Sequence, residues 1–172
     1  MAPRKLVQVR QVRTTILFVG EGFGEARLLE HVRSLYLRER AGHKMDVKNA
    51  RGKGAAHVVD FAVRQSRQAQ YDHVAVLLDT DTGWTPQVIA RAEGERIAVI
   101  KSEPCLEAWL LDVVGHGAVR TSDGHKRAFL KTLGFTAHDA RVYPAHFSRP
   151  TFDAARGRVA NVAALLALLG VG

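Results

Sequence analysis

The sequence lacks the residues and segments that several protein classes require. Cys105 is the one cysteine in 172 residues, which excludes an internal disulfide and a cysteine zinc cluster. No stretch approaches the roughly 20 apolar residues of a membrane-spanning helix. Residues 1–13 lack the continuous apolar segment of a signal peptide. We therefore expect a cytoplasmic protein.

Several catalytic and cofactor motifs are also missing. The eight histidines form no H-x-H or H-x-x-x-H pair, so a histidine zinc site has no local support. No G-x-S-x-G elbow is present to indicate a serine hydrolase. The segment Gly20-Glu-Gly-Phe-Gly24 is followed by Glu25 where a dinucleotide-binding turn needs glycine or alanine, and no G-K-[ST] follows it. The sequence therefore contains no recognisable nucleotide-binding loop.

Apolar residues and positive charge are abundant. Apolar residues make up 47% of the chain, enough for a buried core in a domain of this length. Lys and Arg together exceed Asp and Glu by 25 to 17, a formal charge of +8. This balance permits a polyanionic partner such as nucleic acid, although it does not identify one.

Short apolar strands alternate with amphipathic helices along the first two thirds of the chain. This order predicts an α/β domain with a mostly parallel sheet flanked by helices. We expect a single domain over residues 1–172, with a core at about 14–114 and a helical extension at about 115–172. Residues 1–13 form either a basic arm or a short edge strand. The expected strands are Thr15–Val19, Lys44–Ala50, Tyr71–Leu78 and Arg96–Ile100.

Helices are expected between and after these strands. The first carries an apolar stripe from Leu28 to Tyr36, and Ser122 is a plausible N-cap of a later one. Residues 138–150 are expected to be irregular. The remaining expected helices are about Ala55–Ala69, Pro86–Gly94, Leu106–Val114, Ser122–Leu133 and Phe152–Leu169.

Two carboxylates follow the apolar run Val74–Leu78. Asp79 and Asp81 are two residues apart, so in extended chain they point the same way. Such a pair is costly unless a cation lies between them. The alternative is that the acids only form a turn or cap the next helix.

A third carboxylate, Glu21, follows the first expected strand. If that strand and the strand ending at Leu78 are neighbours about 4.8 Å apart, Glu21, Asp79 and Asp81 converge at one edge of the sheet. Carboxylate oxygens suit Mg²⁺ or Mn²⁺. Glu25, taken alone, is better explained as an acid that complements the dipole of the first helical turn.

Three motifs in this order resemble those of a known family. Glu21-Gly-Phe-Gly-Glu25 is similar to the E-G-x-T-E signature of RloB-like and OLD-type proteins, and Asp79-Thr-Asp81 follows a later strand, as in a Toprim domain. The stretch Ser102–Leu111 resembles the P-C-F-E-x-W-L-L segment of RloB-like proteins. The chain departs from the pattern at Gly24, where the signature usually has threonine, and at Leu106, where an aromatic residue is usual.

The resemblance implies a Toprim fold and Mg²⁺- or Mn²⁺-dependent phosphodiester chemistry on nucleic acid, in defence against phage. By matching positions it makes Glu21, Glu25, Asp79 and Asp81 candidate metal ligands, with Glu107 in or beside the site.

Two basic elements could contact phosphate. Lys101 follows a strand at the same expected edge and could stabilise charge on a transferred phosphoryl group, or it could be a solvated lysine. Lys53, in the glycine-rich loop Arg51–Gly54, could hold a phosphate.

Two functions therefore compete. The first is a metal-dependent nuclease in which Glu21, Asp79, Asp81 and Lys101 are catalytic and a metal-bound water is the nucleophile. The second is a non-catalytic nucleic-acid-binding or regulatory module that works beside an ATPase. The sequence does not distinguish DNA from RNA as the substrate.

Overall fold

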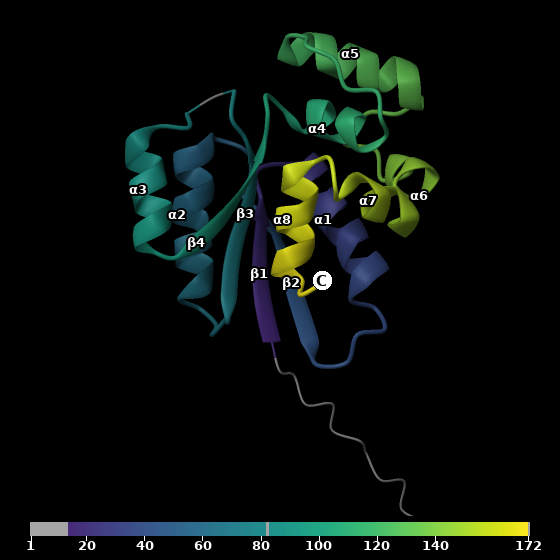
Figure 1. Ribbon diagram of the computed structural model, residues 1–172. Helices are drawn as coiled ribbons and strands as arrows, with labels where there is room; N and C mark the ends of the chain where they lie inside the picture. The colour runs from purple at the N-terminus through teal and green to yellow at the C-terminus, as the bar shows by residue number, and fades with distance from the viewer. Residues whose placement is uncertain (1–13, 82, 172) are drawn as a thin grey trace, which may run out of the picture.

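A four-stranded, all-parallel sheet forms the centre of the molecule. The computed structural model describes residues 14–81 and 83–171. The strands lie in the order β2-β1-β3-β4, as Figure 1 shows. This arrangement confirms the α/β fold expected from the alternating pattern. The strands are β1 (Thr14–Gly20), β2 (His43–Asn49), β3 (His73–Asp79) and β4 (Ile97–Ser102).

Helices cover both faces of this sheet. In β1, Ile16 and Phe18 belong to one apolar core and Leu17 and Val19 to the other, and all four are fully buried. Helix α1 (Phe23–Tyr36) covers the first face, while α2 (Ala55–Ser66) and α3 (Pro86–Gly94) cover the second. A strand buried on both faces needs apolar residues at every position, which explains the unbroken apolar runs.

The chain changes direction between β1 and β3. After β1 it passes through α1 to β2 at one edge, and it then returns through α2 on the opposite face to β3. Neighbouring strands β1 and β3 are therefore left by connections that run to opposite sides of the sheet. Open α/β sheets bind ligands at such a switch point, beyond the carboxyl ends of the strands.

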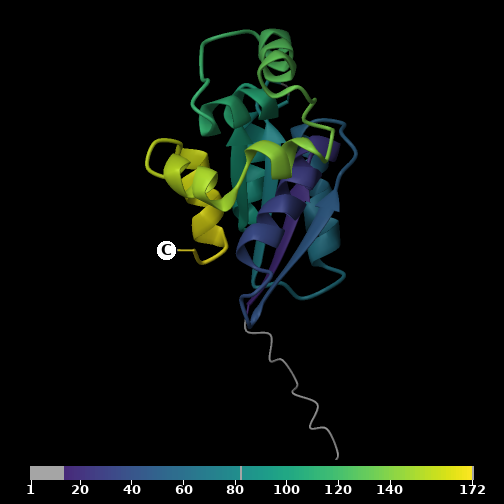
Figure 2. The same ribbon diagram turned by 90° about the vertical axis from the view of Figure 1, so that its right-hand side faces the viewer.

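The helices after β4 extend the core on the α1 face. Figures 1 and 2 show them gathered beside α1, with α5 beyond the carboxyl edge of the sheet. Their buried side chains, among them Phe129, Phe152 and Leu165, belong to the same apolar cluster as Leu28 of α1. These helices are α4 (Leu106–Val113), α5 (Ser122–Leu133), α6 (Val142–His146), α7 (Arg149–Ala155) and α8 (Ala160–Leu168).

Two expectations for this region are wrong. Residues 138–150 are not irregular, because they contain α6 and the start of α7. The single helix expected over Phe152–Leu169 is interrupted between α7 and α8. The Arg158 guanidinium stabilises the chain between α7 and α8 by donating hydrogen bonds to the carbonyl oxygens of Asp112 and Val113 at the end of α4.

The N-cap of α5 also differs from the expectation. Thr121, not Ser122, is the N-cap, and its Oγ1 accepts a hydrogen bond from the Gly124 N–H at 3.1 Å. The arm or edge strand expected for residues 1–13 lies outside the described residues. Within 14–81 and 83–171, no helix has the length and apolar character needed to cross a bilayer.

Candidate metal centre at the carboxyl edge of the sheet

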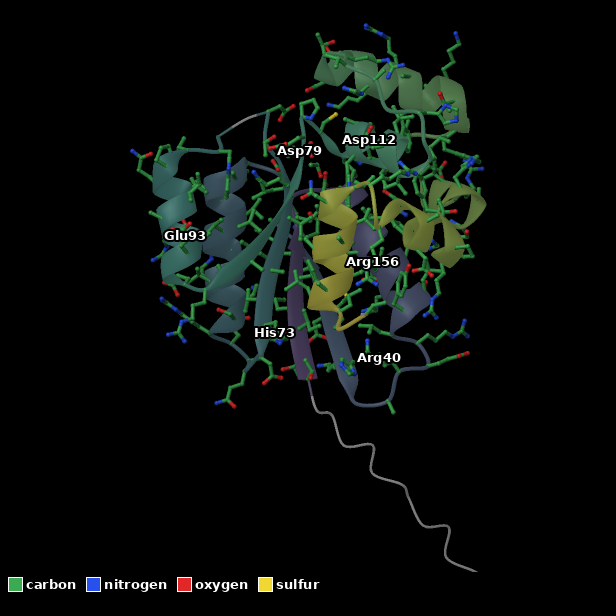
Figure 3. All side chains as sticks on the ribbon, in the orientation of Figure 1. Arg40, His73, Asp79, Glu93, Asp112 and Arg156 are labelled. Atoms are coloured by element: carbon green, nitrogen blue, oxygen red, sulfur yellow. The ribbon has the colours of Figure 1, made fainter. Side chains whose placement is uncertain are left out.

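Glu21 and Asp79 lie side by side at the ends of β1 and β3. The two strands pair in parallel, which confirms the expected neighbours. The Glu21 N–H donates to the Leu77 carbonyl at 2.9 Å, and the Asp79 N–H donates to Glu21 Oε2 at 3.1 Å. Figure 3 shows Asp79 at this edge of the sheet.

Glu25 is brought to the same edge by the first turn of α1. Its Oε2 accepts a hydrogen bond from the Gly22 N–H at 2.9 Å, which closes the start of the helix. Gly20 permits this close approach, because a Cβ there would lie 2.7 Å from the Ala26 nitrogen and 2.9 Å from Glu25 Cβ. Glu25 therefore caps the start of α1 by a hydrogen bond, in addition to the predicted position in the first helical turn, and it is also a member of the carboxylate group.

Glu107 and Asp81 complete the group from two other elements. Glu107 lies in the first turn of α4 and is buried. Asp81 is exposed in the segment after β3, and its Oδ2 accepts a hydrogen bond from the Ser122 hydroxyl at 3.1 Å. The structure therefore gathers all five carboxylates named from the sequence at one edge, four of them close enough to Asp79 to affect its pKa.

Burial and repulsion from neighbouring acids disfavour ionisation of Asp79, Glu21 and Glu25. Burial, followed in order of effect by the charges of Glu25, Glu21, Asp81 and Glu107, raises the pKa of Asp79 to about 8. The pKa values of Glu21 and Glu25 are also raised, mainly by burial. For Glu21, hydrogen bonds from the Asp79 and Gly54 backbone N–H groups oppose this rise.

Asp79 Oδ1 is the atom that fits a cation best. It is buried and has no hydrogen-bond partner, a situation that costs free energy unless a cation or water satisfies it. The surrounding donors are carboxylate oxygens, the ligands that Mg²⁺ and Mn²⁺ prefer. The donor chemistry therefore fits a hard divalent ion.

The side chains are not arranged as a closed metal cage. Among the described residues, no three His, Cys, Asp or Glu side chains are placed so that they could hold one ion together. The Glu25 carboxylate accepts a hydrogen bond from the Gly22 N–H, whereas the Asp81 carboxylate is exposed and accepts one from the Ser122 hydroxyl. Closing a ligand set around Asp79 therefore requires side-chain movement, with water or phosphate oxygens filling the remaining positions.

The two predicted phosphate-binding lysines lie at the carboxyl ends of β4 and β2. The Lys101 ammonium is 3.5 Å from a Glu103 carboxylate oxygen and is directed to that partner. Lys53 is exposed in the loop after β2, whose Gly52 N–H donates to the Glu21 carbonyl at 2.7 Å. This hydrogen bond joins the loop to the carboxyl end of β1. A phosphate contact by Lys101 or Lys53 stays a prediction.

Ser102 is a site residue that sequence reasoning missed. It lies opposite Asp79 in the pairing of β3 and β4, and its hydroxyl is fully buried without a partner. The only signal was its position in the polar segment that ends the fourth expected strand. The nearby Cys105 thiol has its pKa raised to about 11 by burial and by Glu107 and Asp79, so it remains neutral.

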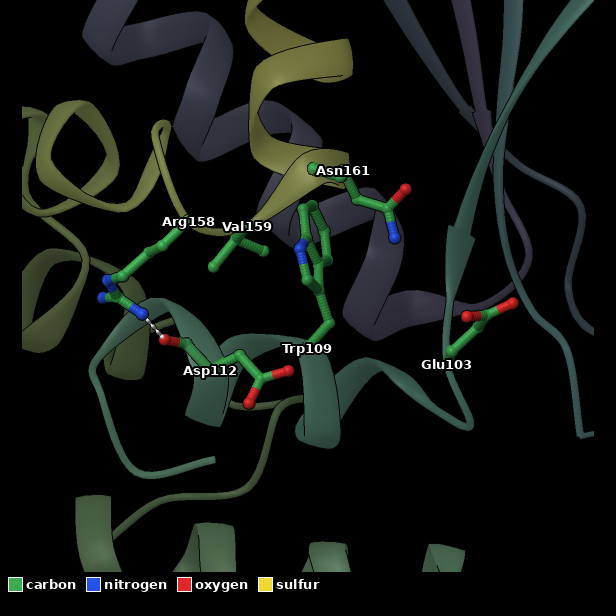
Figure 4. A pocket seen from close by; sticks show the side chains of 7 residues that line it. Glu103, Trp109, Asp112, Arg158, Val159 and Asn161 are labelled. Atoms are coloured by element: carbon green, nitrogen blue, oxygen red, sulfur yellow. Dashed lines mark hydrogen bonds between the residues drawn. The ribbon is translucent and has the colours of Figure 1, made fainter. Parts of the chain in front are cut away.

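A separate cavity of about 450 Å³ lies between α4 and the start of α8. Figure 4 shows Glu103, Trp109 and Asn161 around it, with the Arg158 guanidinium hydrogen-bonded to the Asp112 backbone carbonyl oxygen. The Asn161 side chain also donates to the Lys101 carbonyl oxygen at the end of β4. These contacts fasten the last helix to the sheet and to α4, and the five carboxylates do not line this cavity.

Comparisons of the chain with protein-family models, with curated proteins and with solved structures found no match.

Proposed function

We propose that this protein is a Mg²⁺- or Mn²⁺-dependent nuclease, or a closely related phosphodiester-processing enzyme, of the RloB-like Toprim kind that acts in defence against phage. The observation that carries the proposal is the unpartnered, buried Asp79 Oδ1 among four further carboxylates at the switch point of the sheet. No Lys or Arg is among the main influences on the pKa of Asp79. A divalent cation would supply the missing positive charge.

The protein's own residues would divide the work. Asp79 and Glu21 would hold the ion, because their strands fix both carboxylates at one point and the Asp79 N–H orients Glu21. Asp81 would close the ligand set by rotation, and Glu25 and Glu107 would add negative charge from buried positions. Bound there, the ion would activate a water molecule and polarise the phosphodiester.

A second candidate is a non-catalytic nucleic-acid-binding or regulatory module that partners an ATPase. The observation that favours it is the open arrangement of the carboxylates, since no three of the described His, Cys, Asp or Glu side chains already form a metal cage. In that case the acids would order the ends of β1 and β3. Lys101, paired with Glu103, would have no part in chemistry.

Calorimetric titration with Mn²⁺ and Mg²⁺ separates the two candidates. We expect wild-type protein to bind the ions and Asp79→Asn/Asp81→Asn to lose affinity by more than about 100-fold, because ligand loss exceeds the effect of changes around the ligands. The matched control, Glu39→Gln/Glu93→Gln, removes two exposed carboxylates elsewhere and should bind as wild type does.

Cleavage of labelled DNA and RNA is then measured with the same proteins. The double variant should keep its circular dichroism spectrum and lose cleavage. Absence of ion binding by the wild type up to millimolar concentration, with nucleic acid present, would overturn the enzyme proposal and leave the binding module.

A further inference from the structure

An open groove of about 840 Å³ lies between the edge strand β2 and helix α2, next to the carboxylate group. Every ionisable side chain that lines it is basic or histidine, and no Asp or Glu of the described chain is among its lining residues. These side chains are Lys48, Arg51, Lys53, His57 and Arg64. The groove therefore attracts a chain of phosphates.

Two phenylalanine rings line the same groove. Phe23, at the start of α1, exposes 60% of its surface although it is one of the larger apolar residues. Phe61 of α2 is half-buried, and the Arg64 guanidinium lies 5.9 Å from its ring centre. Exposed aromatic rings among cations are the features with which proteins stack unpaired bases while holding the backbone.

The groove leads to the carboxylates. Phe23 follows Glu21 by two residues, and the Gly52 N–H in the basic loop donates to the Glu21 carbonyl oxygen. The Gly54 N–H also supports the Glu21 carboxylate. A nucleic-acid strand that lies over Phe23 and Lys53 would therefore run toward Glu21 and Asp79.

We infer that this groove binds a single-stranded segment of nucleic acid next to the candidate metal centre. Stacking on Phe23 requires a base whose face is free, and paired bases inside a duplex do not offer one. The role of the groove in guiding a substrate rests on the proposed function, whereas the binding itself does not.

Fluorescence anisotropy with a labelled oligothymidylate and an oligouridylate of about 12 nucleotides tests the groove. The assay contains EDTA and about 0.1 M salt, so that binding is measured without cleavage. Lys48→Gln/Lys53→Gln should weaken binding about tenfold and reduce the slope against log salt by about 1.4, at about 0.7 per lost contact. Arg38→Gln/Arg96→Gln removes the same charge from exposed positions outside the groove and should leave binding unchanged.

Substitutions of Phe23 test stacking separately from charge. Phe23→Leu retains an apolar side chain without an aromatic face and should weaken binding about tenfold, whereas Phe23→Trp should retain it. Phe23 is exposed, so both variants should fold. Equal loss in the groove and control charge variants, no effect of Phe23→Leu, or competition by duplex as strong as by single strand would each overturn the inference.

The two proposals fail differently. Wild-type protein that binds the oligonucleotide in EDTA, but neither binds Mn²⁺ nor cleaves any nucleic acid, would overturn the nuclease proposal and support the groove as a binding site. Metal-dependent cleavage by the wild type, together with unaltered oligonucleotide binding by the groove variants, would support the nuclease proposal and overturn the groove as the binding site.

Discussion

The ionisation of Asp79 ties the candidate site to the stability of the fold. Its pKa is raised from 3.8 to about 8 by burial and by four neighbouring acids. The folded protein therefore holds a proton that the unfolded chain releases between these values. This contribution to stability is fully present below the unfolded pKa, and it is lost as the pH rises through the folded pKa.

Asp79→Asn should remove this loss, because an amide does not ionise. We expect the variant to gain about 4 kcal/mol of unfolding free energy relative to wild type between about pH 5 and pH 8, without divalent ions. Urea denaturation in EDTA at several pH values measures the difference. Glu93→Gln, an exposed control on α3, should run parallel to wild type. Asp79→Asn running parallel as well would contradict the pKa assignment.

The sequence allowed part of this group to be predicted. Glu21 and Asp79 could be brought together because each follows an apolar strand, and parallel strands end at the same edge. Glu107 entered only through the resemblance, because a glutamate in a helix has no distinguishing local pattern. Ser102 was missed because its burial depends on β4 lying next to β3, which no property of that residue indicates.

At the scale of elements, the two departures from the RloB-like motifs contact each other. A Cβ added at Gly24 in α1 would lie 2.8 Å from Leu106 Cδ2 in α4. The Tyr143 hydroxyl also donates to the Gly24 carbonyl oxygen at 2.9 Å. The first turns of α1 and α4, which carry Glu25 and Glu107, are thus in direct contact, and a side chain at position 24 has no room beside Leu106.

A double-mutant cycle tests this contact. Gly24→Thr alone should destabilise the fold by about 1–3 kcal/mol through overpacking, and Leu106→Ala alone by about 2–5 kcal/mol through a cavity. The double variant should lose at least about 1 kcal/mol less than the sum, because the smaller residue makes room for the threonine. Unfolding free energies from urea titration give the four values. Strict additivity would show that the two positions do not interact.

The helices after β4 were less predictable than the strands. The apolar stripe over Phe152–Leu169 suggested one helix, since local pattern does not reveal that Arg158 bonds to the end of α4. Helix α6 was missed because it is a single short turn with Pro144 inside it. Strand positions follow from uninterrupted apolar runs, whereas helix breaks in this region follow from contacts distant in sequence.

On the scale of the whole molecule, one sheet joins two cores that are filled by different parts of the chain. Helices α2 and α3 fill the core on one face, and α1 with the five helices after β4 fills the other. The candidate site lies where the two halves of the sheet are joined, between β1 and β3. Its carboxylates come from the residue after β1, from α1, from the end of β3, from the segment that follows and from α4. The site therefore depends on both faces being folded.

The two tryptophans report on the two cores separately. Trp84 packs against the α2 and α3 side, whereas Trp109 is buried on the α1 side. Trp84→Phe and Trp109→Phe each leave one tryptophan. Because β1 and β3 contribute residues to both cores, we expect each variant to unfold in a single transition. The transitions measured by fluorescence and by far-ultraviolet circular dichroism should coincide. Earlier loss of the Trp109 signal than of the circular dichroism would show instead that the helices after β4 unfold as a separate unit, and the carboxylate group would then lose Glu107 while Glu21 and Asp79 remained together.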